Sequence, residues 1–138
     1  MTLPEAFTAT ALRARLAVSE VSLPRWGWVA PLLIVIFAAF LRLWNVSNPN
    51  AIVFDETYYA KDGYSMLHFG YERNWSEDAN DSFVAGSPSG VKDTGEYVVH
   101  PPLGKWMIAA GMAVFGDNNP LGWRFSAALI GTLSVALV

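Results

Sequence analysis

A run of uncharged, apolar residues near the start of the chain constrains its fold most strongly. The segment WGWVAPLLIVIFAAFL, residues 26–41, contains no charged side chain, and after Arg42 the apolar character continues to Trp44. Nineteen helical residues would extend about 28 Å, close to the thickness of the hydrocarbon core of a bilayer. Tryptophans stand at both ends of the run, where aromatic side chains favour the membrane–water interface. We therefore expect a transmembrane helix over residues 26–45.

The composition of the chain agrees with a membrane protein. Hydrophobic residues make up 53% of the chain, charged residues only 15%, and the mean hydropathy is +0.29, whereas about 25% of the residues of a soluble domain are charged. The small net charge of −3 argues against a nucleic-acid partner. The chain has no cysteine, which excludes disulfides and thiolate metal sites.

A second apolar segment ends the chain. It follows the turn sequence GDNNP, and residues 125–138 are uncharged up to the last residue. A membrane span needs about 20 apolar residues, so residues 121–138 are interpreted as a truncated second transmembrane helix. We therefore expect the chain to be an N-terminal fragment of a longer protein.

The charges between the two apolar segments predict the orientation of the chain. Residues 46–100 contain nine acids and three bases, whereas residues 1–25 contain three arginines and two acids. The positive-inside tendency then predicts a cytoplasmic N-terminal tail, residues 1–25, and an extracytoplasmic loop, residues 46–120. Apolar periodicity predicts juxtamembrane helices over about 56–69 and 102–115. The Ser-, Gly- and Asp-rich residues 76–96 predict a mobile segment between them.

Two adjacent acids, Asp55 and Glu56, begin the first of these helices. Asp55 has two interpretations, as the N-cap of the helix or as a general base, and Glu56 is well placed near the positive helix end. Successive residues of a helix point about 100° apart, so the two carboxylates are not expected to address one substrate atom together. If both are functional, one is a base and the other positions a partner.

The sequence HPPLGK, residues 100–105, begins the second helix. Pro102 suits a first helical turn, and Lys105 is unfavourable against the helix dipole unless an anion lies beside it. A phosphate would be such an anion, and a solvated lysine beside a rigid turn is the alternative. Arg42 and Arg124 are expected at the same membrane boundary, where they either bind a ligand or extend to the lipid headgroups.

The order of these segments resembles the start of an actinobacterial protein O-mannosyltransferase of the GT-C superfamily. The matching stretches are LRLW, VFDETYYAKDGYSML, HPPLGKWMIAAG and LGWRFSAALIGTLSVALV, and the resemblance covers residues 28–138. It implies an all-α integral membrane fold, the N-terminal part of a multi-span glycosyltransferase in the plasma membrane of a bacterium. It also implies that mannose passes from polyprenyl-phosphate mannose to Ser or Thr hydroxyls of secreted proteins, with membrane lipid and the secretion translocon as further partners.

The resemblance assigns roles to six residues. Asp55 matches the catalytic base of the family and Glu56 its second acid, and the residues matching those near the donor phosphate are Arg42, His100, Lys105 and Arg124. The reaction would invert the anomeric carbon, by the logic of inverting glycosidases. Cationic side chains could stabilise the leaving phosphate, so no metal or other cofactor is required; a metal ion bound by Asp55 and Glu56 is the alternative.

Two other functions stay open at this point. Bacterial aminoarabinose transferases share the Asp-Glu pair and a Pro-Pro-Leu stretch, but His100 followed by Gly104 and Lys105 favours the protein mannosyltransferase. A non-catalytic membrane scaffold would use the acids as helix caps and the arginines as headgroup contacts. If the chain is an enzyme fragment, we expect it to be inactive alone, because related enzymes use many more spans.

Overall fold

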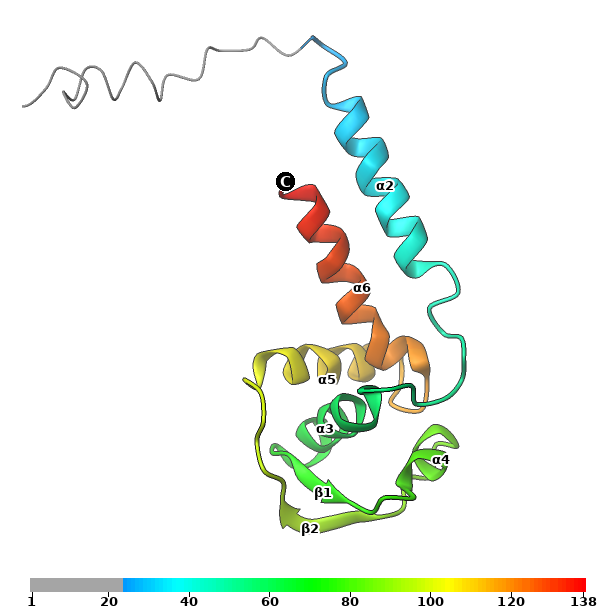
Figure 1. The fold of residues 1–138 in the computed structure, drawn as a ribbon, viewed down its shortest axis with the longest axis vertical. Helices are drawn as coiled ribbons and strands as arrows, with labels where there is room; N and C mark the ends of the chain where they lie inside the picture. Colours follow the sequence, from blue (N-terminus) through cyan, green and yellow to red (C-terminus); the bar gives the residue numbers. More distant parts are fainter. Residues whose placement is uncertain (1–23) are drawn as a thin grey trace, which may run out of the picture.

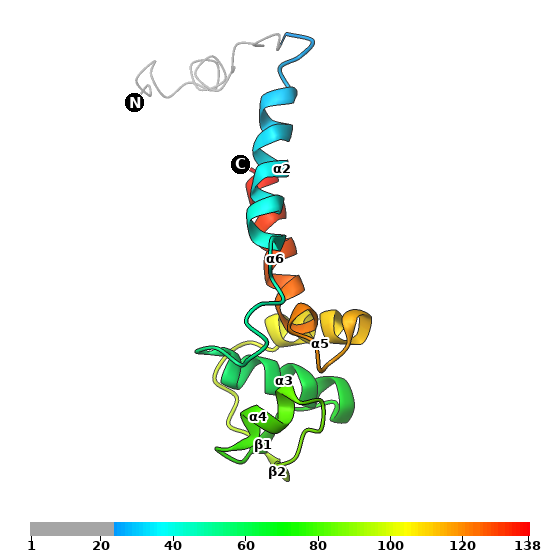
Figure 2. The same ribbon diagram turned by 90° about the vertical axis from the view of Figure 1, so that its right-hand side faces the viewer.

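The computed structural model describes residues 24–138. Along them the chain forms α2 (Val29–Leu43), α3 (Glu56–Phe69), β1 (Arg73–Trp75), α4 (Ala79–Val84), β2 (Val91–Gly95), α5 (Leu103–Phe115) and α6 (Pro120–Ala136). Figures 1 and 2 show α2 and α6 as an upright antiparallel pair, with the other helices and the two strands grouped below its lower end. The predicted tail, residues 1–25, lies almost wholly outside the described residues.

The helix pair α2 and α6 exposes many apolar side chains. Side chains such as Ile34, Phe37 and Leu133 are about half exposed or more. α2 is shorter than the transmembrane helix expected over residues 26–45, because the chain turns before Val29 and leaves helical geometry at Trp44. None of the helices within residues 24–138 has both the length and the apolar character needed to cross a membrane.

The lower group is held together by close approaches of helix backbones. A Cβ on Gly63 of α3 would lie 2.6 Å from a side-chain carbon of Ile108 on α5, and one on Gly111 of α5 would lie 2.3 Å from the carbonyl oxygen of Gly122 on α6. These contacts leave no room for a larger residue. α3 and α5 coincide closely with the stretches over which the sequence predicted helices, and their packing fixes how the acids and bases of the two helices meet.

A small core fills the space between the helices of the lower group. Aromatic rings meet there edge to face, as between Phe83 and Tyr64, whose ring centroids are 5.6 Å apart. The buried members of the core come from four segments of the chain: Ala60, Phe83, Met112 and Trp123. Such aromatic pairs add to the stability that burial of their apolar area provides.

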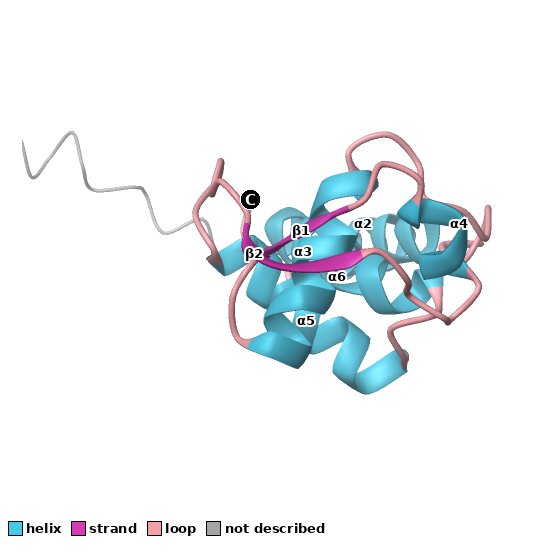
Figure 3. Ribbon diagram, turned by 90° about the horizontal axis from the view of Figure 1, so that it is seen from below, coloured by secondary structure: helices cyan, strands magenta, loops and turns pink. Residues whose placement is uncertain are grey.

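A two-stranded antiparallel sheet corrects two expectations. β1 pairs with β2 under α3 (Figure 3), so the lower group is not purely helical. The segment 76–96, predicted to be a mobile loop, contains all of α4 and all of β2. The sheet is anchored because Trp75 contacts Tyr64 and Phe83, and its indole N–H donates to Ser65 Oγ at 3.0 Å.

Candidate functional site

The start of α3 separates its two acids. Asp55 occupies the N-cap position but makes no side-chain cap hydrogen bond, so the expected capping role of Asp55 is not found. Glu56 bonds instead to the residue three positions before it: its Oε2 accepts the backbone N–H of Val53 at 3.0 Å, and its own N–H donates to the Val53 carbonyl at 3.1 Å. The carboxylate bond to the N–H three residues earlier is one half of a capping box; the other half is missing, because the valine side chain has no hydrogen-bond acceptor. The Asp55 carboxylate is therefore left free of the helix end.

Glu56 also forms an ion pair with Arg124 of α6. The Arg124 Nε–H donates to Oε1 at 2.6 Å, and Nη2 donates to Oε2 at 2.8 Å, a two-bond arrangement with high directional specificity. Burial acts to raise the pKa of Glu56, but the bonds from Arg124 and Val53 outweigh it, and the pKa is lowered below the usual value. Glu56 is thus an ionised group that orients a partner.

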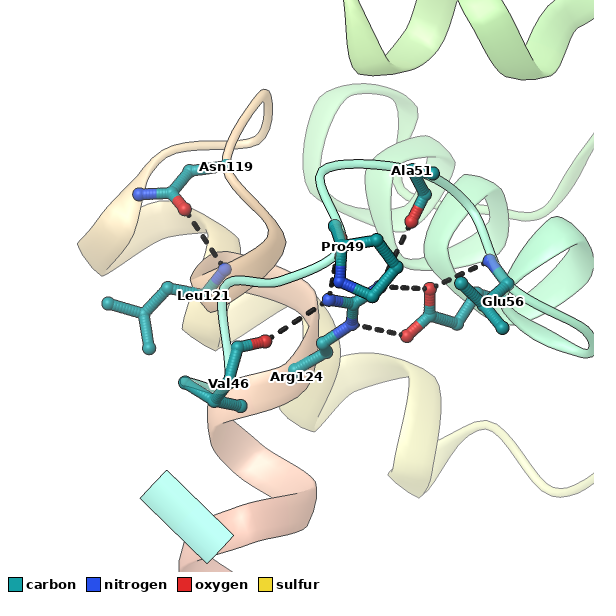
Figure 4. Close-up of polar contacts among 8 residues, drawn as sticks. Val46, Pro49, Ala51, Glu56, Asn119, Leu121 and Arg124 are labelled. Carbon is teal, nitrogen blue, oxygen red and sulfur yellow. Dashed lines mark hydrogen bonds and ion pairs between the residues drawn. The ribbon is translucent and has the colours of Figure 1, made fainter. Parts of the chain in front are cut away.

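Arg124 uses its remaining donors on the segment before α3. Its Nη1 donates to the carbonyls of Val46 and Pro49 at 3.1 and 2.9 Å, and Nη2 donates to that of Ala51 at 2.9 Å, as Figure 4 shows. Together with the two bonds to Glu56, these occupy all five N–H donors of a guanidinium. A phosphate contact from Arg124, as expected from the sequence, would require one of these bonds to break.

Lys105 on α5 has two internal anions. Its Nζ lies 2.8 Å from Asp62 Oδ2 and 2.8 Å from Glu72 Oε1, and all three side chains are at most 6% exposed. Burial acts to lower the pKa of Lys105, but the bonds to both carboxylates have the larger, opposite effect. The pKa is therefore raised above its usual value and the group stays charged. The anion that a lysine needs near a helix N-terminus is therefore supplied by the chain itself. Sequence reasoning expected a phosphate in this place.

A pocket of about 250 Å³ brings three of the six predicted site residues together. Asp55, His100 and Lys105 line it, whereas Glu56, Arg124 and Arg42 do not. Its other walls come from α3 and from the segment before α5: Tyr58, Tyr59, Asp62, Glu96, Tyr97 and Val99. The His100 ring lies 5.8 Å from that of Tyr59. Asp55 and Glu56 therefore face different surroundings, which agrees with separate roles.

Sequence reasoning missed three carboxylates of this region, Asp62, Glu72 and Glu96. A signal for Asp62 was present, because positions 55, 59 and 62 share one face of a helix. For Glu96 there was no signal except that it lies close to His100 in sequence, in a segment interpreted as a loop. Burial and the neighbouring Asp62 raise the pKa of Glu96 to about 7, against the lowering effect of Lys105 and Lys61.

An apolar pocket adjoins the polar one. It has a volume of about 320 Å³, opens between α5 and α6, and shares Tyr59, His100 and Lys105 with the polar pocket. Its apolar walls include Met107, Ile108 and Ile130. Arg42 lies elsewhere, on α2, where it packs against α6: a Cβ on Gly131 would lie 2.8 Å from its Nε. Within residues 24–138 no acid pairs with Arg42.

Comparisons with known proteins find relatives of two kinds. The chain is 37% identical over 117 residues to a polyprenol-phosphate-mannose–protein mannosyltransferase of Mycobacterium tuberculosis. The matched region covers 81% of this chain and 19% of the relative. The corresponding protein of Mycolicibacterium smegmatis is 38% identical over the same shares. An undecaprenyl phosphate-aminoarabinose arabinosyl transferase of Pseudomonas fluorescens is 37% identical over 110 residues, 80% of the chain and 16% of the relative.

Two further comparisons give no match. No family model matches the chain, and no solved structure matches it. The chain spans less than a fifth of the length of the curated relatives named above. Over about four fifths of its own length it is homologous to glycosyltransferases, and the resemblance predicted from its motifs is confirmed: this chain is a relative of the mycobacterial polyprenol-phosphate-mannose–protein mannosyltransferases.

Proposed function

We propose that the protein containing this chain transfers mannose from a polyprenyl-phosphate mannose to Ser or Thr hydroxyls of secreted proteins. The relatives' names describe this donor and a protein acceptor. One observation carries the proposal: a polar pocket holding a free carboxylate, Asp55, adjoins an apolar pocket through shared residues. A lipid-linked sugar has a polar head and an apolar chain, and this pair of pockets matches both parts.

In the proposed reaction Asp55 is the general base. Its carboxylate accepts the proton of the Ser or Thr hydroxyl while the hydroxyl oxygen attacks the anomeric carbon of mannose. The bond between that carbon and the phosphate oxygen breaks, and its electron pair leaves with the polyprenyl phosphate. A single displacement of this kind inverts the anomeric carbon. Asp55 suits the role because no helix-cap bond occupies its side chain.

The other predicted residues take supporting roles. Glu56, through Arg124, holds the segment that carries Asp55 in place. We propose His100, which lines both pockets, and Arg42, which has no acidic partner within residues 24–138, as contacts of the leaving phosphate. Lys105 and Arg124 would join them only by giving up internal bonds. Because cationic side chains can stabilise the phosphate, the proposed reaction needs no metal or other cofactor.

We further propose that α2 and α6 lie in the membrane as the first elements of an all-α, multi-span GT-C fold. Support comes from their exposed apolar side chains, including Leu33, Phe37 and Leu133, which would otherwise face water. The arginines of residues 1–25 favour a cytoplasmic N-terminus. The pocket with Asp55 would then open on the extracytoplasmic side, where secreted acceptors emerge from the translocon.

A second candidate function is transfer of another sugar from a polyprenyl phosphate to a lipid or glycan. The homology to an aminoarabinose transferase, 37% identity over 110 residues, favours it. The chain spans only 16% of the length of this relative. The two functions share the base and the leaving phosphate and differ in the sugar and the acceptor.

The experiment that separates them uses the full-length protein in membranes. It is supplied with polyprenyl-phosphate mannose or undecaprenyl-phosphate aminoarabinose, and with a Ser/Thr peptide or lipid A as acceptor. We expect mannose on the peptide and no other product. Transfer to lipid A alone would favour the second function, and no transfer with any pair would favour a scaffold.

A further inference from the structure

Glu96 stands between two polar pockets. It lines the pocket that holds Asp55 and also a second pocket of about 330 Å³, whose other residues include Asn74, Trp75 and Glu77. Glu96 directly precedes the segment 97–100, and three residues of that segment form one wall of the first pocket: Tyr97, Val99 and His100. The bonds that hold Glu96 in place therefore affect the position of this wall.

The segment 97–100 has few attachments of its own. The backbone N–H of Glu96 donates to the Glu72 carbonyl at 3.1 Å, and after it residues 97–100 make no hydrogen bond within the described part of the chain. Tyr97 and Val99 are 85% and 68% exposed. The closest aromatic contact of His100 is the Tyr59 ring. Glu96 is thus the last firmly bonded residue before the wall.

Asp62 offers Glu96 an unused acceptor. Its Oδ2 is bonded to Lys105, but Oδ1 is buried and has no hydrogen-bond partner. Two carboxylates can hydrogen-bond only if one of them carries a proton, and a proton on Glu96 would satisfy the buried Oδ1. The raised pKa of Glu96, about 7, agrees with such sharing because burial and Asp62 are its main causes.

We propose that Glu96 is a positioning residue that shares one proton with Asp62. This bond fixes the wall 97–100 against α3 and α5. It thereby shapes the pocket in which an acceptor hydroxyl would meet Asp55. This role rests on the proposed function. The charged and titratable groups around Glu96 are Asp55, Tyr58, Tyr59, Lys61 and Asp62 of α3, Lys105 of α5, Glu72 and Glu77 beside the strands, and Tyr97 and His100 of its own segment.

Loss of the shared proton should loosen the wall. When the pH rises through 7, Glu96 and Asp62 carry like charges at short range and repel each other. The pocket then holds the acceptor less well, so KM for the acceptor rises while kcat changes less. Glutamine at position 96 does not titrate and can still donate to Asp62 through its amide, so it removes this pH dependence.

The test measures KM and kcat of mannosyl transfer to a Ser/Thr peptide by the full-length protein in membranes, at pH values on both sides of 7. It compares the wild type with Glu96→Gln and with Glu77→Gln, a control acid of the second pocket only. We expect KM to rise several-fold with pH in the wild type and in Glu77→Gln, and to stay constant in Glu96→Gln. A wild-type KM without this step, or the same step in Glu96→Gln, overturns the proposal.

A second measurement does not depend on transfer. The infrared carbonyl band of a protonated carboxyl, present in the wild type and absent in Glu96→Gln, should disappear as the pH passes 7. A Glu96 that ionises near the ordinary glutamate value of 4.5 overturns the proposal. If the wild type shows this band but no transfer to peptide, the proposed function fails while the shared proton stands. If the glutamine variant does not fold, the wild-type KM profile still decides.

Discussion

The Glu56 carboxylate and the Arg124 guanidinium lie 68 residues apart in sequence and meet through two bonds of 2.6 and 2.8 Å. The same guanidinium holds three carbonyls of the segment that leads into α3. Asp55 directly precedes Glu56 and lines a pocket to which neither Glu56 nor Arg124 contributes. One arginine of α6 thus fixes the position from which the proposed base acts, although it does not line the pocket.

Replacing Arg124 by lysine should reduce mannosyl transfer by the full-length protein about 100-fold, mainly in kcat. Lysine presents a single point of charge and cannot make the two-bond contact or hold three carbonyls at once, and misplacing a catalytic group by about 1 Å can cost about 100-fold. Steady-state kinetics with a peptide acceptor measure the effect. Arg73→Lys is the control, because Arg73 pairs with the exposed Asp93. A normal kcat in Arg124→Lys would contradict the positioning role.

Replacing Asp55 by asparagine should abolish most transfer and leave stability unchanged. A general base contributes about 10²- to 10⁴-fold to the rate, and Asp55 makes no cap bond whose loss could weaken α3. Transfer rate and unfolding temperature are measured on the same preparation. Asp78→Asn is the matched control, since Asp78 holds the N-cap position of α4 and also makes no side-chain cap bond. Full activity in Asp55→Asn would show that another group is the base.

The sequence predicted local structure well and side-chain partners poorly. Apolar periodicity located α3 and α5, because a helix that packs on a neighbour repeats its apolar residues every turn. The dipole argument correctly required an anion for Lys105, but the anion comes from Asp62 and Glu72. The contact of Glu56 with Arg124 spans 68 residues and depends on how α5 and α6 fold back. A local sequence pattern cannot predict a contact between residues so far apart in the chain.

Replacing Lys105 by methionine should destabilise the protein by about 3–5 kcal/mol. Methionine has nearly the same length, so the loss comes from leaving the carboxylates of Asp62 and Glu72 buried without a cation. Thermal or chemical unfolding of the full-length protein in detergent reports the change. Lys92→Met on the exposed strand β2 should stay within about 0.5 kcal/mol of the wild type. Equal stability of the two variants would mean that the buried cluster contributes little.

Replacing Gly111 by alanine should separate α5 from α6. The new Cβ would lie 2.3 Å from the carbonyl oxygen of Gly122, which is backbone and can move only with the helix. Overpacking of this kind costs about 1–3 kcal/mol. Gly104→Ala on the same helix meets no atom within 4 Å and should be neutral or slightly stabilising. We expect Gly111→Ala to have the lowest unfolding temperature, and Gly104→Ala to unfold at or slightly above the temperature of the wild type.

Glu96 should make the stability of the protein depend on pH. Its pKa is about 7 in the folded protein, above the ordinary value of 4.5, so between these values the folded state keeps a proton that the unfolded state has lost. The stabilisation is therefore complete below 4.5, decreases as the pH rises, and is gone above about 7. One pKa unit corresponds to about 1.4 kcal/mol, and partial exposure of Glu96 reduces the whole effect to about 1 kcal/mol.

Glu96→Gln, which does not titrate, should therefore gain about 1 kcal/mol relative to the wild type between the two pKa values. Unfolding midpoints of the full-length protein at several pH values measure this difference. Glu77→Gln is the control, because it changes an exposed acid that lines only the second pocket. If the Glu96→Gln difference were constant with pH, the two carboxyl groups would not share a proton in the folded protein.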